Sequence, residues 1–168
     1  FGNSGQVCSA CSRLLVHESI ADPLVERIAA RAQRITIGPP ADDPDLGPLV
    51  SAEQHAKVVG HIEAARRAGA RLVCGGGGRP PGLERGFYVE PTLFDRVDPA
   101  LPIAREEVFG PVLAVTRFGD EAEALALANG LDYGLCAGVY TADIGRALRL
   151  ARALEAGSVW IKDRKSVV

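Results

Sequence analysis

The sequence predicts an α/β fold in which a mostly parallel sheet carries helices on both faces. Two observations indicate this fold. Segments with strand-like and helix-like periodicity alternate along the 168 residues, and the predicted strands are largely apolar. Apolar strands of this kind are buried on both sides, which requires helices above and below the sheet. We find no internal repeat and no linker that would divide the chain.

The first half of the chain supplies two amphipathic helices between short strands. Pro23 is acceptable in the first turn of the first helix. Ser51 is a predicted N-cap, Gln54 is expected to complete a capping box with it, and Gly69 is expected to end that helix. The expected elements are a strand at 12–18, a helix at 20–35, a loop at 38–51, a helix at 51–70 and a strand at 71–74.

The second half repeats the alternation, with glycines as helix stops. Gly130 and Gly157 each follow a helix-like run, and glycine is the residue that most often ends a helix. Pro91 interrupts the first extended segment. The expected elements are an extended segment at 87–97, a strand at 111–118, a helix at 120–130, a strand at 135–141, a helix at 142–157 and a strand at 158–161.

Composition excludes several classes of partner. The net charge is −2 and no basic cluster is present, so we expect no nucleic-acid partner. Apolar runs are too short to cross a membrane. Four scattered cysteines do not form a secreted disulfide framework, so the cytoplasm is the expected compartment. The chain contains no methionine, even at position 1, which predicts that it is a fragment.

The stretch FGNSGQVCSACSR raises the main chemical question, because it places Cys8 and Cys11 three residues apart. If Asn3 or Ser4 caps a short helix beginning near Gly5, Cys8 lies at its positive end, which favours a thiolate. Cys11, one turn further on, is then expected to be buried, like the other two cysteines. The alternatives are a redox pair and a metal site formed by the two thiols.

A metal site lacks further ligands in the sequence, since no second C-x-x-C exists and His55 and His61 are six residues apart on a helix. That spacing puts the two imidazoles on different faces. We therefore predict no metal.

The run of glycines at 75–78 lacks the following G-K-[ST] of a phosphate loop and is read as a connection. Trp160 is expected to pack in the core.

Taken whole, FGNSGQVCSACS resembles the cysteine signature of the aldehyde dehydrogenase superfamily. REEVFGPVLAV at 105–115 is similar to a second signature of that family. The segments LGPLVS, GFYVEPTLF, ANGLDYGLCAGVYTAD and EAGSVWI also resemble family segments in the same order. The resemblance covers almost the whole chain, and it implies the catalytic-domain type of α/β fold, truncated at both ends.

The resemblance implies a role for three residues. Cys8 matches the nucleophile that forms a thiohemiacetal and then a thioester with the aldehyde, and its backbone N–H matches one oxyanion donor. Glu107 matches the carboxylate that binds the nicotinamide ribose of NAD or NADP, and Phe109 the aromatic beside the nicotinamide. The second oxyanion donor, the general base and the nucleotide-binding domain belong to upstream segments. Asn129 and Gly134 match a segment with a mostly structural role.

The family also implies a small aldehyde substrate and a homodimer or homotetramer for the full-length enzyme. Neither the aldehyde nor the choice between NAD and NADP follows from these residues. Residues 1–162 are thus expected to form part of a catalytic domain. Residues 163–168 depart from the family pattern, and one back-translation of DRKSVV resembles a sequencing-library adapter, so this tail is expected to be non-native, with Lys162 replacing an asparagine.

Overall fold

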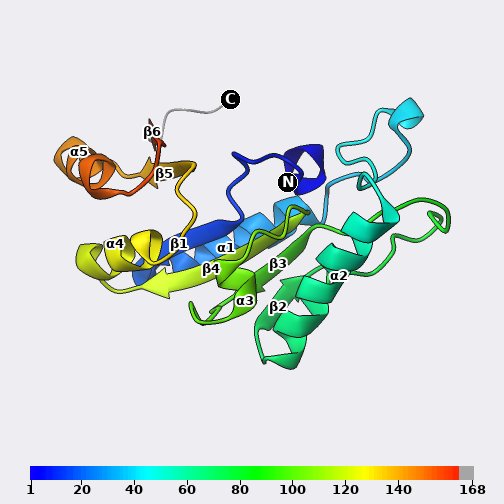
Figure 1. The fold of residues 1–168 in the computed structure, drawn as a ribbon, viewed down its shortest axis with the longest axis horizontal. Coiled ribbons are helices and arrows are strands. Elements are labelled where there is room, and N and C mark those ends of the chain that lie inside the picture. The colour runs from blue at the N-terminus through cyan, green and yellow to red at the C-terminus, as the bar shows by residue number, and fades with distance from the viewer. Residues whose placement is uncertain (163–168) are drawn as a thin grey trace. The chain divides into compact units, whose positions relative to one another are not determined.

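A four-stranded sheet forms the centre of the first of two units in the computed structural model, which describes residues 1–162 (Figure 1). This unit comprises Phe1–Arg117, and the second begins at Phe118. The predicted foreign tail at 163–168 lies outside the described residues. The strands lie in the order β1 (Arg13–His17), β4 (Val112–Phe118), β3 (Thr92–Asp95) and β2 (Arg71–Cys74).

Strand direction and side-chain alternation explain the layers of this unit. β3 and β4 run parallel, and β2 joins β3 antiparallel at the edge of the sheet. Because successive side chains on a strand point to opposite faces, Leu93 packs with Val25 of α1 (Glu18–Ala32), whereas Phe94 packs with Ile62 of α2 (Ala52–Arg67).

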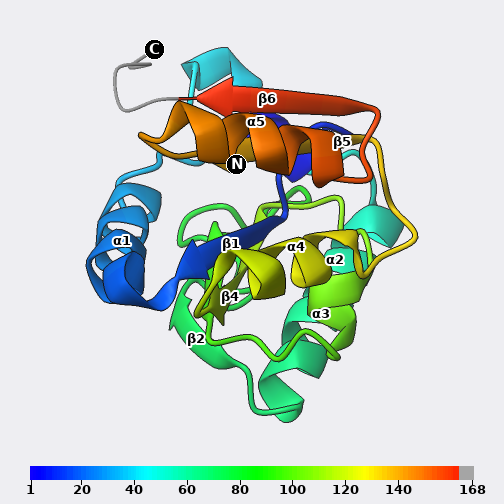
Figure 2. The same ribbon diagram turned by 90° about the vertical axis from the view of Figure 1, so that its left-hand side faces the viewer.

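The short helix α3 (Pro102–Arg105) packs on the same face as α2. Figure 2 shows α1 and α2 on opposite sides of the sheet. The predicted α/β fold, with a mostly parallel sheet covered on both faces, is confirmed.

The helix boundaries differ from the predictions for local reasons. α1 begins two residues early, because the His17 side chain accepts a hydrogen bond from the Ser19 N–H at 3.2 Å and caps it. Pro23 therefore falls in the second turn. Ser51 caps α2 as predicted, accepting from the Gln54 N–H at 3.1 Å. The predicted capping box is wrong, since the Gln54 side chain turns away to a distant loop.

The second unit is a β–α–β arrangement with an additional helix. β5 (Cys136–Tyr140) and β6 (Ser158–Lys162) run parallel and are joined through α5 (Ile144–Ala153), while α4 (Glu121–Asn129) precedes them. The Asn129 amide donates to the Ala153 carbonyl at 2.9 Å and accepts from the Glu155 N–H at 3.0 Å. This side chain therefore holds the end of α5 in place, in keeping with the expected structural role.

Trp160 lies on β6, and the prediction that it packs in the core is wrong. Its exposed fraction is 47%. Other large apolar side chains of this unit are also exposed; they are Tyr133, Leu135, Tyr140, Ile144, Leu148 and Ile161. The strand pattern SVWI predicted the element correctly but could not show which of its faces is covered.

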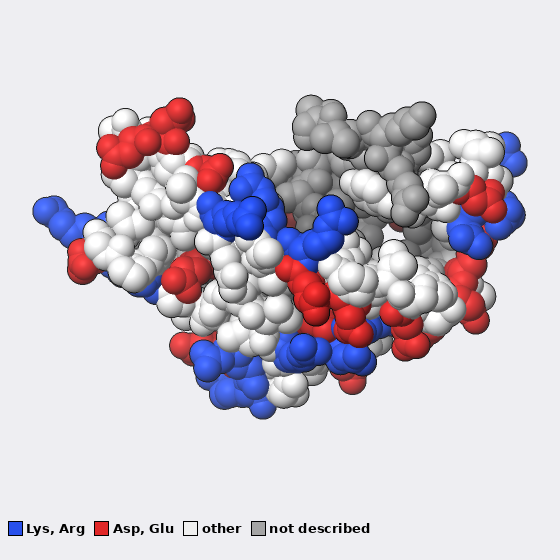
Figure 3. All heavy atoms as spheres, turned by 180° about the vertical axis from the view of Figure 1, so that it is seen from behind, with Lys and Arg blue, Asp and Glu red and all other residues white. Residues whose placement is uncertain are grey.

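The surface carries charges of both signs. On the face drawn in Figure 3, acidic and basic side chains lie interspersed, as a net charge of −2 would suggest. Within residues 1–162, no helix is long and apolar enough to cross a membrane.

Candidate active site

The first motif begins with a left-handed turn. The backbone φ angles of Asn3, Ser4 and Gly5 are 51°, 54° and 73°. Residues other than glycine rarely adopt this region. The hydroxyl of buried Ser4 donates to the Gly47 carbonyl at 2.7 Å. The short helix predicted to begin near Gly5 is therefore wrong: the residues expected to cap it form a turn fixed by a contact with a distant loop.

Gln6 adds a second connection between the same two loops. Its side-chain oxygen accepts from the Val50 N–H at 2.9 Å, and the neighbouring Leu49 N–H donates to the Phe87 carbonyl at 2.9 Å. Three loops that are far apart in the sequence thus meet around the N-terminal motif.

Cys8 follows in a turn closed by a hydrogen bond from the Ala10 N–H to the Val7 carbonyl at 2.9 Å. Its thiol is exposed, so a small substrate can approach it. Cys11 is exposed as well, and the prediction that it is buried is wrong because no helix carries it inward. Cys74 does pack partly into the core beside α1, where burial raises the pKa of its thiol.

The second motif forms the loop between α3 and β4. Val108 is buried, Phe109 is half-buried and Glu107 is exposed. Phe109 has a φ of 54°, a conformation that costs a non-glycine residue about 1–2 kcal/mol. Surrounding contacts must therefore hold the loop in this shape.

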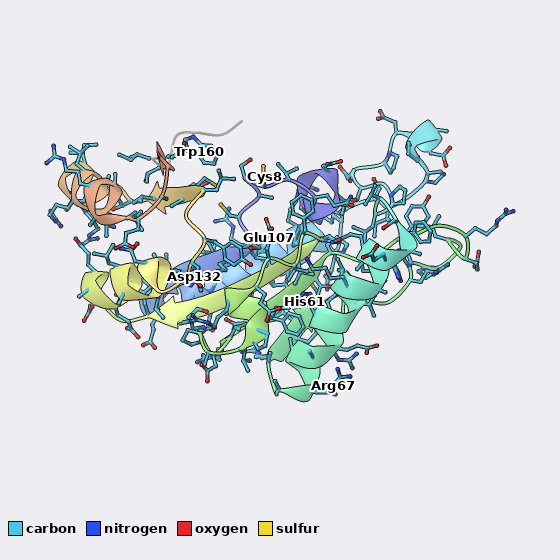
Figure 4. The ribbon with its side chains drawn as sticks, viewed as in Figure 1. Cys8, His61, Arg67, Glu107, Asp132 and Trp160 are labelled. Atoms are coloured by element: carbon cyan, nitrogen blue, oxygen red, sulfur yellow. The ribbon has the colours of Figure 1, made fainter. Side chains whose placement is uncertain are left out.

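The predicted site residues Cys8 and Glu107 both lie on the first unit, as Figure 4 shows. Their motifs touch at two glycines. A Cβ atom on Gly5 would lie 1.9 Å from the Gly110 carbonyl oxygen, so only glycine allows this approach. A Cβ on Gly110 would in turn lie 2.5 Å from a methyl group of Val58 on α2. Close backbone packing thus brings the left-handed turn three residues before Cys8 against the end of the loop that carries Glu107 and Phe109.

Charged groups flank both motifs. Arg13 follows the first motif, and burial together with the Arg105 guanidinium lowers its pKa. The imidazole of His61 lies 4.0 Å from the Glu106 carboxylate. Burial lowers the pKa of His61, and Glu106 opposes part of that effect. Among residues 1–162, the Glu107 carboxylate takes part in no ion pair, which leaves its oxygens available as acceptors.

A dihydroxy group fits this carboxylate, because each of its oxygens can accept a hydrogen bond from a neighbouring hydroxyl. Half-buried Phe109 supplies an apolar face two residues away. These two side chains are those that could hold a ribose and an attached aromatic ring. In the part of the chain that the structure describes, no group of three metal-ligating side chains comes together.

The sequence reasoning missed a buried ion pair at the far end of β3 and β4. The Arg117 guanidinium donates to both carboxylate oxygens of Asp95, at 3.2 and 2.7 Å. These side chains are 8% and 1% exposed. A charged residue at the end of each predicted strand was the available signal. Arg117 follows the second motif by two residues on β4, and its pair with Asp95 has a structural place in the sheet.

Comparison with known proteins places these motifs in context. The profile described as the aldehyde dehydrogenase family matches residues 1–168. A betaine aldehyde dehydrogenase of Brucella anthropi is 45% identical over 163 residues, which cover 96% of this chain and 34% of that protein.

Two solved structures are similar in fold as well as in sequence. HpcC of Thermus thermophilus has a TM-score of 0.93 and 42% identity over 100% of this chain and 34% of its own. A betaine aldehyde dehydrogenase of Staphylococcus aureus in complex with NAD+ has a TM-score of 0.92 and 40% identity, covering 98% of this chain and 33% of its own. The chain thus spans about a third of the length of the relatives it matches.

Proposed function

Since this chain belongs to the aldehyde dehydrogenase family, we propose that it forms part of an enzyme that oxidises an aldehyde to a carboxylic acid with NAD+ or NADP+. The observation that carries the proposal is the contact between Gly5 and Gly110. This contact joins the turn that precedes the exposed Cys8 thiol to the end of the loop that carries the Glu107 carboxylate, and the two segments would supply a nucleophile and a cofactor contact.

In the proposed mechanism, the Cys8 thiolate attacks the carbonyl carbon and forms a thiohemiacetal. The Cys8 backbone N–H donates to the oxyanion that develops. A bound nicotinamide would accept the hydride from the thiohemiacetal carbon, which leaves a thioester on Cys8. Water then hydrolyses the thioester: the C–S bond breaks, the carboxylic acid is released, and the Cys8 thiol is regenerated. Glu107 and Phe109 are the residues that would hold the cofactor: Glu107 would accept hydrogen bonds from the ribose hydroxyls, and Phe109 would pack beside the ring.

We propose a small aldehyde as the substrate and NAD+ as the first cofactor to test. The support is that two relatives are betaine aldehyde dehydrogenases, one of them in complex with NAD+. Betaine aldehyde is therefore the first substrate to assay. A homodimeric or homotetrameric enzyme in the cytoplasm remains the expectation for the full-length protein.

The test compares Cys8→Ala with Cys11→Ala in a full-length enzyme that carries this chain. We expect Cys8→Ala to abolish aldehyde-dependent NADH formation and to leave cofactor binding largely intact. Cys11→Ala serves as the matched control, because both thiols are exposed, and it should retain turnover. Normal turnover by Cys8→Ala would remove the basis of the proposal.

The same two exposed thiols leave one alternative function, a redox module that uses a Cys8–Cys11 disulfide. Mass spectrometry after mild oxidation and after reduction distinguishes the two functions. A reversible disulfide in an enzyme without dehydrogenase activity would favour the redox module.

A further inference from the structure

A glutamine on α2 contacts the loop that carries the proposed cofactor residues. The side-chain nitrogen of Gln54 donates to the Val108 carbonyl at 3.1 Å and to the Phe109 carbonyl at 2.7 Å. Glu107 lies directly before these two residues in the chain. One amide group thus satisfies two consecutive carbonyls of a loop that lies more than fifty positions away in sequence.

Gln54 is the first of three contacts along one face of α2. Val58, four residues later, packs against Gly110 at the end of the loop. His61, seven residues after Gln54, faces the Glu106 carboxylate at the beginning of the loop (Figure 4). Residues spaced by four and seven positions share one face of a helix. This face of α2 therefore contacts the loop at its beginning, middle and end.

The contact of Gln54 with the middle of the loop matters most, because the backbone there is strained. Phe109 has a φ of 54°, and such a conformation persists only where its surroundings enforce it. Without the amide of Gln54, the Val108 and Phe109 carbonyls would lose their donor in a partly buried environment. The loop would then relax toward an ordinary backbone conformation, and the direction of the Glu107 side chain would change with it.

We propose that Gln54 is a positioning residue for the dehydrogenase reaction: it holds the Val108–Phe109 backbone so that Glu107 and Phe109 meet the nicotinamide ribose in the productive geometry. This inference rests on the proposed function of the chain. Gln54 acts through the loop, and its own contacts here are with backbone carbonyls.

Two substitutions test this role in a full-length enzyme that carries the chain. Gln54→Glu keeps the size of the side chain but replaces the N–H donor with an acceptor that repels both carbonyls. Gln54→Met removes the donor without adding charge, and it serves if the first variant folds poorly. Gln33→Glu is the matched control, because Gln33 is exposed at the end of α1 and undergoes the same change of charge.

We expect Gln54→Glu to lower the single-turnover hydride-transfer rate by about 10- to 100-fold, since small displacements of reacting groups carry effects of this size. The Kd for the cofactor should change less than the rate. Hydrogen exchange of the cofactor-free enzyme should be faster for the amides of 107–110 and 112 and unchanged elsewhere. Gln33→Glu should leave the rate and the exchange pattern unaltered.

A double-mutant cycle with Glu107→Gln separates the inference from the proposed function. If Gln54 acts through Glu107, the two substitutions together should lower the rate by much less than the product of their separate effects. Normal rates in both Gln54 variants, with a slow Glu107→Gln enzyme, would overturn only the role of Gln54. A normal rate in Glu107→Gln would overturn both the proposed role of Glu107 and the inference built on it.

Discussion

At the scale of single residues, Gly5 is the position with the least freedom to change. Its φ is 73°, and a Cβ there would lie 1.9 Å from the Gly110 carbonyl oxygen. We expect Gly5→Ala to lower the free energy of unfolding by at least about 1–3 kcal/mol, measured by urea denaturation. Gly60→Ala in α2 is the control with the opposite sign. No atom would lie within 4 Å of its new Cβ, and alanine favours a helix by about 0.5–1 kcal/mol.

Glu107 should affect the chemical step more than cofactor affinity. In a full-length enzyme, we expect Glu107→Gln to lower kcat by about 10-fold or more, because hydride transfer depends steeply on geometry. The Kd for NAD+ should change little, since the family places most nucleotide contacts in another domain. Stopped-flow measurement of NADH formation checks this prediction. Glu26→Gln, at an exposed position of α1, is the control and should behave like the unaltered enzyme. A Glu107→Gln enzyme with equally normal kinetics would refute the proposed contact of Glu107 with the ribose.

The cysteines should differ in their reaction with iodoacetamide. Cys74 is partly buried, and its pKa is raised, so less of it is thiolate at pH 7 than for an ordinary thiol. We expect Cys74 to be labelled more slowly than the exposed Cys8 and Cys11, as followed by peptide mass spectrometry. In denaturing urea the three rates should converge, and slow labelling of Cys74 that persists there would contradict burial as the cause.

Residues differ in how far the sequence could predict them. Cys8, Glu107 and Phe109 were named from motifs, because a family signature carries residue identity and order along the chain. For Gln54, the local sequence predicts only a capping role. Its amide donates across 54 and 55 positions of sequence, and no local pattern indicates such a contact. Local capping rules also predict a short helix beginning near Gly5 with Ser4 as a possible cap, whereas the Ser4 hydroxyl instead reaches Gly47.

At the scale of elements, β3 and β4 depend on the ion pair at their ends. Arg117→Met would leave the Asp95 carboxylate, which is 1% exposed, with only the more distant and exposed guanidinium of Arg71 at 3.4 Å. We expect the free energy of unfolding to fall by about 3–5 kcal/mol, measured by urea denaturation. Arg96→Met removes a cation whose side chain is 55% exposed and should have a much smaller effect. Equal effects of the two substitutions would show that burial of the pair contributes nothing.

The contact between His61 of α2 and Glu106, in the loop between α3 and β4, predicts a pH dependence of stability. Burial lowers the pKa of His61 below its ordinary value of 6.5, the neighbouring Lys57 acts in the same direction, and Glu106 opposes them. The unfolded chain therefore binds a proton at a higher pH than the folded chain does. Stability contributed by neutral His61 should be complete above about pH 6.5 and decrease as the pH falls from there toward the folded pKa.

Replacement of this histidine supplies the test. His61→Phe should flatten the dependence of Tm on pH between about pH 6.5 and pH 5, because the group that titrates in this range is gone. Scanning calorimetry over that range measures the slope. An unchanged slope in His61→Phe would assign the titration to another group.

Most elements were predictable because their periodicity is strong, whereas the connections were not. The alternation of Leu93 and Phe94 between two helix layers is visible in an apolar strand only as continuous hydrophobicity. The left-handed turn at 3–5 is invisible to helix rules, since contacts with the 47–50 loop stabilise it. Long-range contacts of this kind decide loop conformation, and a local sequence window does not contain them.

At the scale of the whole molecule, the 168 residues alone should not turn over aldehyde. The chain spans about a third of the relatives it matches, and the resemblance implies that the nucleotide-binding domain, the general base and the second oxyanion donor belong to other segments. Loss of a general base alone typically lowers a rate by about 10²–10⁴-fold. We expect no aldehyde-dependent NADH or NADPH formation by the purified chain, and robust turnover would show that the catalytic parts were misassigned.

Trp160 is the single tryptophan of the chain, and its 47% exposure has a spectroscopic consequence. Its fluorescence should already resemble that of a solvated indole in the folded state, with a red-shifted emission and strong quenching by acrylamide. Because the indole is already exposed in the folded chain, unfolding should leave this emission almost unchanged. Far-UV circular dichroism should record that transition, so a flat fluorescence curve alongside a sigmoidal dichroism curve is the expected unfolding signature.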